Sequence, residues 1–414
     1  MLSTSDNELI CRTDAGTPMG DLFRRFWLPA LLPSELPSPD CAPVRLRILG
    51  EDLIAFRSTD GRVGFVANAC PHRGASLFFG RNEENGLRCV YHGWKFDVNG
   101  DCVDMPSEPV ESNFKSKVRV RAYAGAEHGG IVWIYMGPKE QQPGLPNYHW
   151  TVQPGSNTRR VYKWLQESNY VQGLEGNIDT AHIGFLHRTL NTMGAQRMPA
   201  NLVAPRLQLK ETEFGFVYGG RRDQEDGQFY WRVTPFVLPT FTSIPNPFWG
   251  GGGIMLIPSD DEHTWWWNVS EPVPAYATTP YIELIPGTWR QTRNKDNDYL
   301  IDRDMQRTYN YTGMPTNRVQ DAAVTESMGT VYDRSKEHLG TSDMAIIFMR
   351  RYLMRIAKEL QEGIEPPIVS NPDLFLVRPV NIYTNEPDLV PIWESDHEAH
   401  VRQPVTAEAA TQAR

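Results

Sequence analysis

The sequence has little of what a disulfide-stapled, membrane-spanning or nucleic-acid-binding protein needs. It has five cysteines in 414 residues and a net charge of −9. No window holds the roughly eighteen uninterrupted apolar residues of a membrane span, and no long lysine or arginine run is present to neutralise phosphates. The first residues have no basic start followed by an apolar segment. We therefore expect a soluble, cytoplasmic protein that binds neither nucleic acid nor membrane.

The sequence also lacks a dinucleotide-binding motif. No GxGxxG follows a predicted strand, and the cysteines do not have plant-type ferredoxin spacing. The chain therefore has no means of collecting electrons from NAD(P)H by itself. If it performs redox chemistry, a separate NAD(P)H-dependent reductase is expected as a partner.

Two short motifs combine cysteine with histidine. Cys70 and His72 form a CxH motif, and Cys89 and His92 form a CxxH motif. Zinc sites usually draw paired cysteines from CxxC turns, whereas each motif here offers one sulfur and one nitrogen. That donor set suits a [2Fe–2S] cluster in which one iron takes both cysteines and the other takes both histidines. The motifs predict a Rieske centre, with a zinc site as the alternative.

A second group of metal-binding residue types lies in the segment GNIDTAHIGFLHRT, which contains Asp179, His182 and His187. A mononuclear Fe(II) site needs two histidines and one carboxylate on one face. Residues five apart are separated by about 140° on an α-helix, so the histidines converge only if the turn is irregular or π-like. Alone, the segment can also be a capping aspartate with two half-exposed histidines.

Several segments of the chain resemble one family. The segments CPHRGASL and CVYHGWKFD resemble the cluster loops of Rieske non-heme iron aromatic-ring hydroxylating oxygenases, and the Asp179 segment has the spacing of their catalytic domain. Three longer segments are similar to the α subunits of the phthalate dioxygenase-like branch: GTPMGDLFRRFWLPAL, ESNYVQGLEGNIDTAH and YDRSKEHLGTSD. The resemblance implies a [2Fe–2S] cluster and Fe(II) as cofactors.

The resemblance also assigns roles to single residues. It implies that Asp321 is the carboxylate that joins His182 and His187 as an iron ligand. It implies that Asp179, the candidate catalytic residue, lies between His182 and the cluster ligand His92 of a neighbouring subunit. Electrons would then cross a subunit interface, so a homotrimer or a dimer of trimers is expected.

The order of predicted elements indicates an α+β protein with an all-β domain followed by an α+β domain. We expect an N-terminal helix and proline-rich lead-in over residues 1–39, an all-β Rieske domain over 40–145, a catalytic domain over 146–400, and a disordered tail over 401–414. Runs such as FGFVYGGRR and HTWWWNVSEP predict an antiparallel sheet flanked by helices, of the helix-grip type, in the catalytic domain. The repeat of Ile346, Met349 and Leu353 predicts a late amphipathic helix that ends at Gly363.

An aromatic carboxylate substrate would need a cation in its pocket, and a guanidinium is the best partner. Candidate substrate-binding residues are Arg221, Arg222, Arg232, Phe248 and Trp249. Adjacent Arg221 and Arg222 point to opposite faces of a regular strand, so at most one of them should contact substrate.

Three functions fit these features. The first is the terminal oxygenase of a multicomponent system that uses O2 to dihydroxylate a phthalate-type or benzoate-type acid, with O-demethylation or diaryl-ether cleavage as the alternative outcome. The second is a Rieske electron carrier, which would hold about two irons per chain where an oxygenase holds about three. The third is a redox sensor, which would show no substrate-dependent oxygen uptake.

Overall fold

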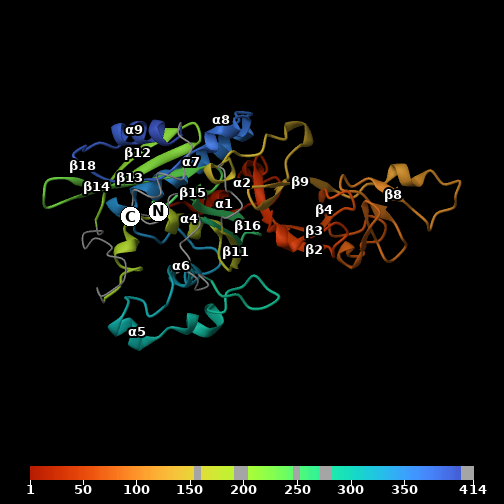
Figure 1. Ribbon diagram of the computed structural model, residues 1–414, viewed down its shortest axis with the longest axis horizontal. Helices are drawn as coiled ribbons and strands as arrows, with labels where there is room; N and C mark the ends of the chain where they lie inside the picture. Colours follow the sequence, from red (N-terminus) through yellow and green to blue (C-terminus); the bar gives the residue numbers. More distant parts are fainter. Residues whose placement is uncertain (153–159, 191–203, 246–251, 271–281, 402–414) are drawn as a thin grey trace, which may run out of the picture.

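The computed structural model describes residues 1–152, 160–190, 204–245, 252–270 and 282–401. Figure 1 shows an elongated molecule in which a smaller, β-rich lobe projects from a larger lobe of sheet and helices. Within the described residues, no helix combines the length and the apolar character that crossing a membrane requires. The predicted tail beyond 401 lies outside the described residues.

Two antiparallel sheets build the smaller lobe. One has six strands in the order β1-β10-β9-β4-β3-β2, and the other has four in the order β5-β6-β7-β8. The first contains β1 (Trp27–Leu31), β2 (Val44–Ile48), β3 (Glu51–Arg57), β4 (Val63–Ala67), β9 (Ala122–His128) and β10 (Ile131–Tyr135). The second contains β5 (Arg81–Glu83), β6 (Gly86–Arg88), β7 (Lys95–Phe96) and β8 (Cys102–Asp104). Strand β1 of the lead-in thus pairs with β10.

An eight-stranded antiparallel sheet forms the centre of the larger lobe. Its order is β11-β17-β16-β15-β14-β13-β12, with β18 paired to β14. The strands are β11 (Arg160–Gln166), β12 (Arg206–Thr212), β13 (Gly215–Asp223), β14 (Phe229–Val237), β15 (Phe241–Thr242), β16 (Gly252–Pro258), β17 (Thr264–Ser270) and β18 (Val380–Thr384). With the helices around it, this sheet confirms the predicted α+β fold.

Helices cover both faces of this sheet (Figure 1). The α-helices of the described residues are α1 (Thr4–Cys11), α2 (Pro18–Phe23), α3 (His149–Val152), α4 (Tyr170–Ile178), α5 (Arg303–Thr308), α6 (Asn317–Glu326), α7 (Met344–Gln361), α8 (Pro367–Ser370) and α9 (Leu389–Val401). Helix α4 approaches so closely that a Cβ on Gly173 would lie 2.9 Å from the Trp266 ring. A Cβ on Gly219 would instead meet Leu389 of α9 at 2.8 Å. The α4 face of the sheet is the inner face that lines the cavity described below.

The late amphipathic helix is confirmed as α7, whose buried residues include Ile346, Met349 and Leu353. Two expectations near other helices need correction. The sequence pattern from Met19 to Trp27 suggests one short helix within the lead-in, but α2 ends at Phe23, and Trp27 already pairs with Tyr135 in a strand. The segment WLQESNYVQGLEGNIDTAH, which starts at residue 164, suggests a helix along its length, but α4 begins only at Tyr170, because residues 164–166 belong to β11 and pair with β17.

A buried network of charges ties the N-terminal helix to the larger lobe. Arg334, which is 0% exposed, donates from Nε to Glu175 Oε1 at 2.7 Å and from Nη1 to Asn7 Oδ1 of α1 at 3.1 Å. Arg350 of α7 donates to the same Glu175 oxygen at 2.7 Å and also pairs with Glu337. Because these charges are out of water, each depends on its partners.

Replacing Arg334 with Met should therefore destabilise the larger lobe. We expect the free energy of unfolding to fall by about 3 kcal/mol, since Glu175 loses one of its two buried cations. Urea denaturation followed by tryptophan fluorescence measures the change. Lys336→Met is the control, because the Lys336 side chain is 78% exposed. Equal unfolding curves for both variants would show that the network adds no stability.

Candidate functional site

Two hairpin-like loops in the smaller lobe present the cysteine and histidine pairs. The loop after β4 is closed by hydrogen bonds from the Cys70 amide to the Ala75 carbonyl and from the Gly74 amide to the Cys70 carbonyl, both 2.8 Å. The loop between β6 and β7 repeats this pattern with Cys89 and Gly93, at 3.0 Å. Gly93 has φ +77°, and a Cβ there would lie 2.7 Å from Pro106, so only glycine fits.

In both loops the cysteine lies on the buried side and the histidine on the outer side. Cys70 and Cys89 are each 3% exposed, and burial, followed by the proximity of Cys89, raises the pKa of Cys70 to about 11. His72 and His92 lie on the half-exposed outer side, with ring centroids 4.4 Å apart. His92 Nδ1 is buried without a hydrogen-bond partner. This arrangement fits a two-iron cluster held by cysteines on the inside and histidines on the outside.

The spread of these donors argues against a single zinc ion. Within the part of the chain that the structure describes, the only group of three or more potential ligands within 4.8 Å of one another lies elsewhere, in the larger lobe. Four donors around one tetrahedral zinc would satisfy that distance, since each lies about 2.0–2.3 Å from the ion. The loops therefore fit a larger group than one ion.

The second motif follows α4 in the larger lobe. Helix α4 ends at Ile178 with Asp179 as its C-cap, and a 3-10 turn covers His182–Gly184. The His182 carbonyl accepts from the amides of Phe185 and Leu186 at 2.9 and 2.8 Å. The sequence spacing required an irregular or π-like turn for two histidines five residues apart to converge. The turn is irregular, and it is of the 3-10 type rather than π-like.

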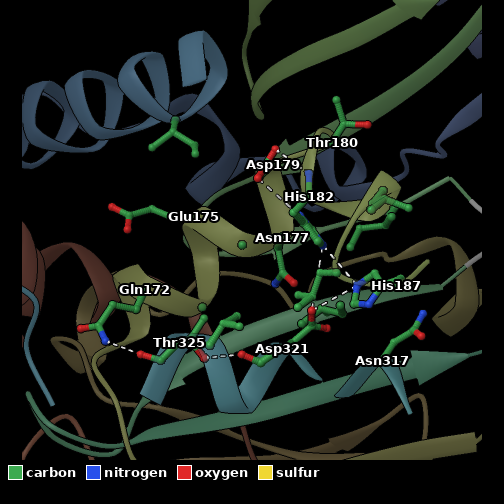
Figure 2. A pocket seen from close by; sticks show the side chains of 18 of the residues that line it. Gln172, Glu175, Asn177, Asp179, Thr180, His182, His187, Asn317, Asp321 and Thr325 are labelled. Carbon is green, nitrogen blue, oxygen red and sulfur yellow. Dashed lines mark hydrogen bonds and ion pairs between the residues drawn. The ribbon is translucent and has the colours of Figure 1, made fainter. Parts of the chain in front are cut away.

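Three donor atoms meet at one point beside this turn (Figure 2). His182 Nε2 and His187 Nε2 are 3.2 Å apart, and Asp321 Oδ1 of α6 lies 3.2 Å from His187 Nε2 and 3.9 Å from His182 Nε2. Two imidazoles and a carboxylate at these distances can hold one metal ion and leave other coordination positions open. The structure thus brings together the three residues predicted to bind the mononuclear iron.

Neighbouring groups keep the acidic side chains ionised. Burial opposes ionisation of Asp321, but the hydrogen bond with His187 and the Arg318 charge outweigh it, and the pKa of Asp321 is lowered. Burial likewise opposes ionisation of Asp179, while interaction with His182 lowers its pKa overall. Asp179 Oδ2 lies 3.5 Å from His182 Nδ1, on the side of the ring away from Asp321. Asp179 therefore has the position of a residue that orients His182.

A cavity of about 940 Å³ opens from the three donors toward the inner face of the sheet. On the sheet it is lined by both polar and apolar side chains, among them Tyr218, Arg232, Thr234, Ile254, Trp266 and Asn268. Asn177 of α4 and Asn317 of α6 line it beside the donors (Figure 2). The volume is large enough for an aromatic ring with substituents.

The three candidate arginines lie in different places. Arg232 lines the cavity, is 5% exposed and donates to the Pro245 carbonyl at 2.9 Å. Among the described residues, its guanidinium forms no ion pair with a carboxylate. Arg222 is buried on the neighbouring strand β13, on the same face of the sheet as Arg232. Its Nη2 donates to the Thr180 carbonyl at 3.0 Å. Burial, and then the Arg232 charge, lowers the pKa of Arg222 to about 10.

Arg221 points away from the cavity, as strand alternation predicted for one member of the pair. Its guanidinium pairs with Asp223 at 3.2 Å and donates to the Pro387 carbonyl at 2.9 Å. It is not among the described residues that line the cavity. Phe248 and Trp249 lie outside the described residues.

Two polar residues of α6 that the sequence did not single out contact the donors. Gln320 Oε1 lies 2.7 Å from His187 Nδ1, and Arg318 Nη1 lies 3.4 Å from Asp321 Oδ2. Spacing could have indicated Arg318, since a residue three positions before a ligand on a helix lies close to it. Gln320 contacts a histidine of another segment, and helix spacing gives no signal for that contact.

Comparisons with known proteins cover both lobes. Residues 26–122 match the family model described as Rieske [2Fe-2S] domain, and residues 134–375 match the model described as LigXa C-terminal domain like. The chain is 37% identical over 433 residues to the 3-chlorobenzoate-3,4-dioxygenase oxygenase subunit of Comamonas testosteroni, covering 97% of this chain and 99% of the relative.

Two further matches agree with these. The chain is 38% identical over 401 residues to the phthalate 4,5-dioxygenase oxygenase subunit of Pseudomonas putida, covering 88% of each. The terminal oxygenase of carbazole 1,9a-dioxygenase from Nocardioides aromaticivorans IC177 has a similar fold, with a TM-score of 0.58 at 19% identity over 85% of this chain and 97% of that one.

Replacing Asp321 with Ala tests the three-donor site. We expect the variant to lose about one of about three irons per chain while the two cluster irons and the acid-labile sulfide stay. Iron and sulfide analysis of purified protein measures this. Asp304→Ala, at a side chain 80% exposed on α5, should keep all the iron. An Asp321→Ala protein with full mononuclear iron would rule out Asp321 as a ligand.

Proposed function

Because the chain belongs to the Rieske non-heme iron oxygenases, as an oxygenase subunit, we propose that it uses O2 to dihydroxylate an aromatic carboxylate of the phthalate or substituted benzoate type. The observation that carries this proposal is the meeting of three metal donors, His182, His187 and Asp321, at the end of a cavity that also holds Arg232. The cofactors of the chain are a [2Fe–2S] cluster and a mononuclear iron.

We assign each cofactor to the residues that fit it. Cys70, His72, Cys89 and His92 would hold the cluster. His182, His187 and Asp321 would hold Fe(II), which with two histidines and one carboxylate leaves positions open for dioxygen. The polar contacts behind the donors keep these side chains in place, so the site is ordered before substrate enters.

The substrate carboxylate would bind Arg232. This guanidinium is buried on β14, already held by the Pro245 carbonyl, and has no described acidic partner. A buried cation without a counter-ion favours an anion of the size that the cavity accepts, and a charge-assisted hydrogen bond to it is strong. Apolar neighbours such as Ile254 and Trp266 would pack against the ring.

Asp179 would relay electrons between the cofactors of two subunits. In Figure 1 the smaller lobe projects away from α4 and α6, so the cluster loops of one chain do not lie against its own donors. His92 is half-exposed and packs on Tyr91, whose side chain is 54% exposed. An apolar, exposed surface beside His92 supports contact with a neighbouring subunit, as in a homotrimer or dimer of trimers. A separate reductase would supply the electrons, and a cytoplasmic location fits such a system.

Labelled dioxygen tests the reaction. With the reductase and 18O2, turnover of benzoates and phthalates should give products that contain two labelled oxygen atoms. Methoxybenzoates and phenoxybenzoates belong in the same screen, because oxidative O-demethylation or ether cleavage is the alternative outcome. Release of formaldehyde from a methoxybenzoate, or of a free phenol from a phenoxybenzoate, would favour that alternative, and no substrate-dependent oxygen uptake would contradict the oxygenase function.

Arg232→Met tests the carboxylate contact. We expect KM for the aromatic acid to rise about 10-fold or more, since a charged hydrogen bond contributes about 1.5–3 kcal/mol. Steady-state oxygen uptake measures KM and kcat. Arg221→Met is the matched control on the neighbouring strand, because Arg221 faces away from the cavity. An unchanged KM in Arg232→Met would contradict the assignment.

A further inference from the structure

Gln320 is a buried amide that contacts the side of the His187 ring opposite the donors. It is 4% exposed and precedes Asp321 on α6. Gln320 Oε1 lies 2.7 Å from His187 Nδ1, and Gln320 Nε2 donates to the Met314 carbonyl at 2.9 Å. Its two polar atoms thus have different partners.

The Met314 carbonyl fixes which end of the amide faces His187. A carbonyl oxygen only accepts hydrogen bonds, and Asn310 Nδ2 also donates to it, at 2.8 Å. Turning the Gln320 amide over would place its oxygen against this carbonyl and its NH2 group against the imidazole. The amide nitrogen therefore faces Met314, and the amide oxygen faces His187.

An oxygen acceptor at 2.7 Å requires a proton on His187 Nδ1. A neutral imidazole has one protonated and one unprotonated nitrogen, so a proton on Nδ1 leaves the lone pair on Nε2. Nε2 is the atom 3.2 Å from both His182 Nε2 and Asp321 Oδ1. The tautomer protonated only on Nε2 would set the Nδ1 lone pair against the Gln320 oxygen.

We propose that Gln320 is a positioning residue that holds a proton on His187 Nδ1 and thereby directs the Nε2 lone pair to the metal. The inference rests on the proposed function only through the assignment of His187 as a metal ligand. Gln320 serves His187 as Asp179 serves His182, but with a neutral acceptor. The two histidines therefore have unlike outer partners, and the carboxylate partner is the one assigned to electron transfer.

Metal binding tests this inference without turnover. Protein stripped of its mononuclear metal is titrated with Co(II), and the dissociation constant is compared between Gln320→Met, Gln320→Glu and the unaltered chain. We expect Gln320→Met to bind Co(II) about 10–100-fold more weakly, the range for losing an outer hydrogen-bond partner. Gln320→Glu keeps an oxygen acceptor for His187 but loses the donor to the Met314 carbonyl, so it should restore part of the affinity and bind Co(II) more tightly than Gln320→Met.

Gln208→Met is the matched control for the lost amide. Gln208 of β12 donates to the Pro387 carbonyl at 3.1 Å and accepts from the Leu389 amide at 2.8 Å, and it contacts none of the three donors. Its Co(II) affinity should equal that of the unaltered chain. Equal affinity in Gln320→Met and the unaltered chain, or a loss that Gln320→Glu does not restore in part, would overturn the inference.

A second, spectroscopic test does not depend on whether the Gln320→Met protein folds. In the Co(II)-substituted chain, the His187 ring proton should appear as a shifted NMR signal that disappears slowly in D2O, and it should persist in Gln320→Glu. Absence of that signal from the unaltered chain would contradict the inference. If the chain binds Co(II) as described but oxygenates no aromatic acid, the proposed function fails while the Gln320 contact stands.

Discussion

The site depends on holding two distant segments together so that three donor atoms meet. The histidines follow α4, whereas the carboxylate comes from α6, far along the chain. Buried amides join the two segments: Gln172 of α4 donates to the Thr325 carbonyl at 2.9 Å, and Gln166 donates to the Thr325 hydroxyl at 2.7 Å. Because these groups are out of water, their hydrogen bonds must be made, and this fixes how α4 and α6 lie together.

The sheet adds a cation and an aromatic side chain to the site, which the three metal donors do not provide. Side chains alternate along each strand, so the inner face alone receives Arg232, Thr234 and Trp266, while neighbouring positions face the outer helix α9. The lining of the cavity thus combines metal donors with a cation and an aromatic ring. A substrate with a carboxylate and an aromatic ring fits such a cavity with its ring toward the donors, and this geometry, rather than the donor set, would decide which carbon reacts.

The sequence predicted the parts of the site that are coded by short-range spacing. The CxH and CxxH motifs lie on loops closed by backbone hydrogen bonds, and the glycines beside them have conformations that demand glycine. Asp321 needed the family resemblance, because one carboxylate among many carries no spacing signal. Strand alternation separated Arg221 from Arg222 but could not show which face is inside, since this depends on how the whole sheet packs. Gln320 was missed because a neutral amide has no distinctive pattern until its partners are in place.

The central claim is that one chain holds two iron sites of different kinds. The most direct measurement is the metal and sulfide content of the purified chain, together with spectroscopy of the reduced cluster. We predict about three irons and about two acid-labile sulfides per chain, no zinc, and nitrogen coupling from two histidines in the reduced cluster. Zinc in place of iron, or only about two irons in fully loaded protein, would contradict the account.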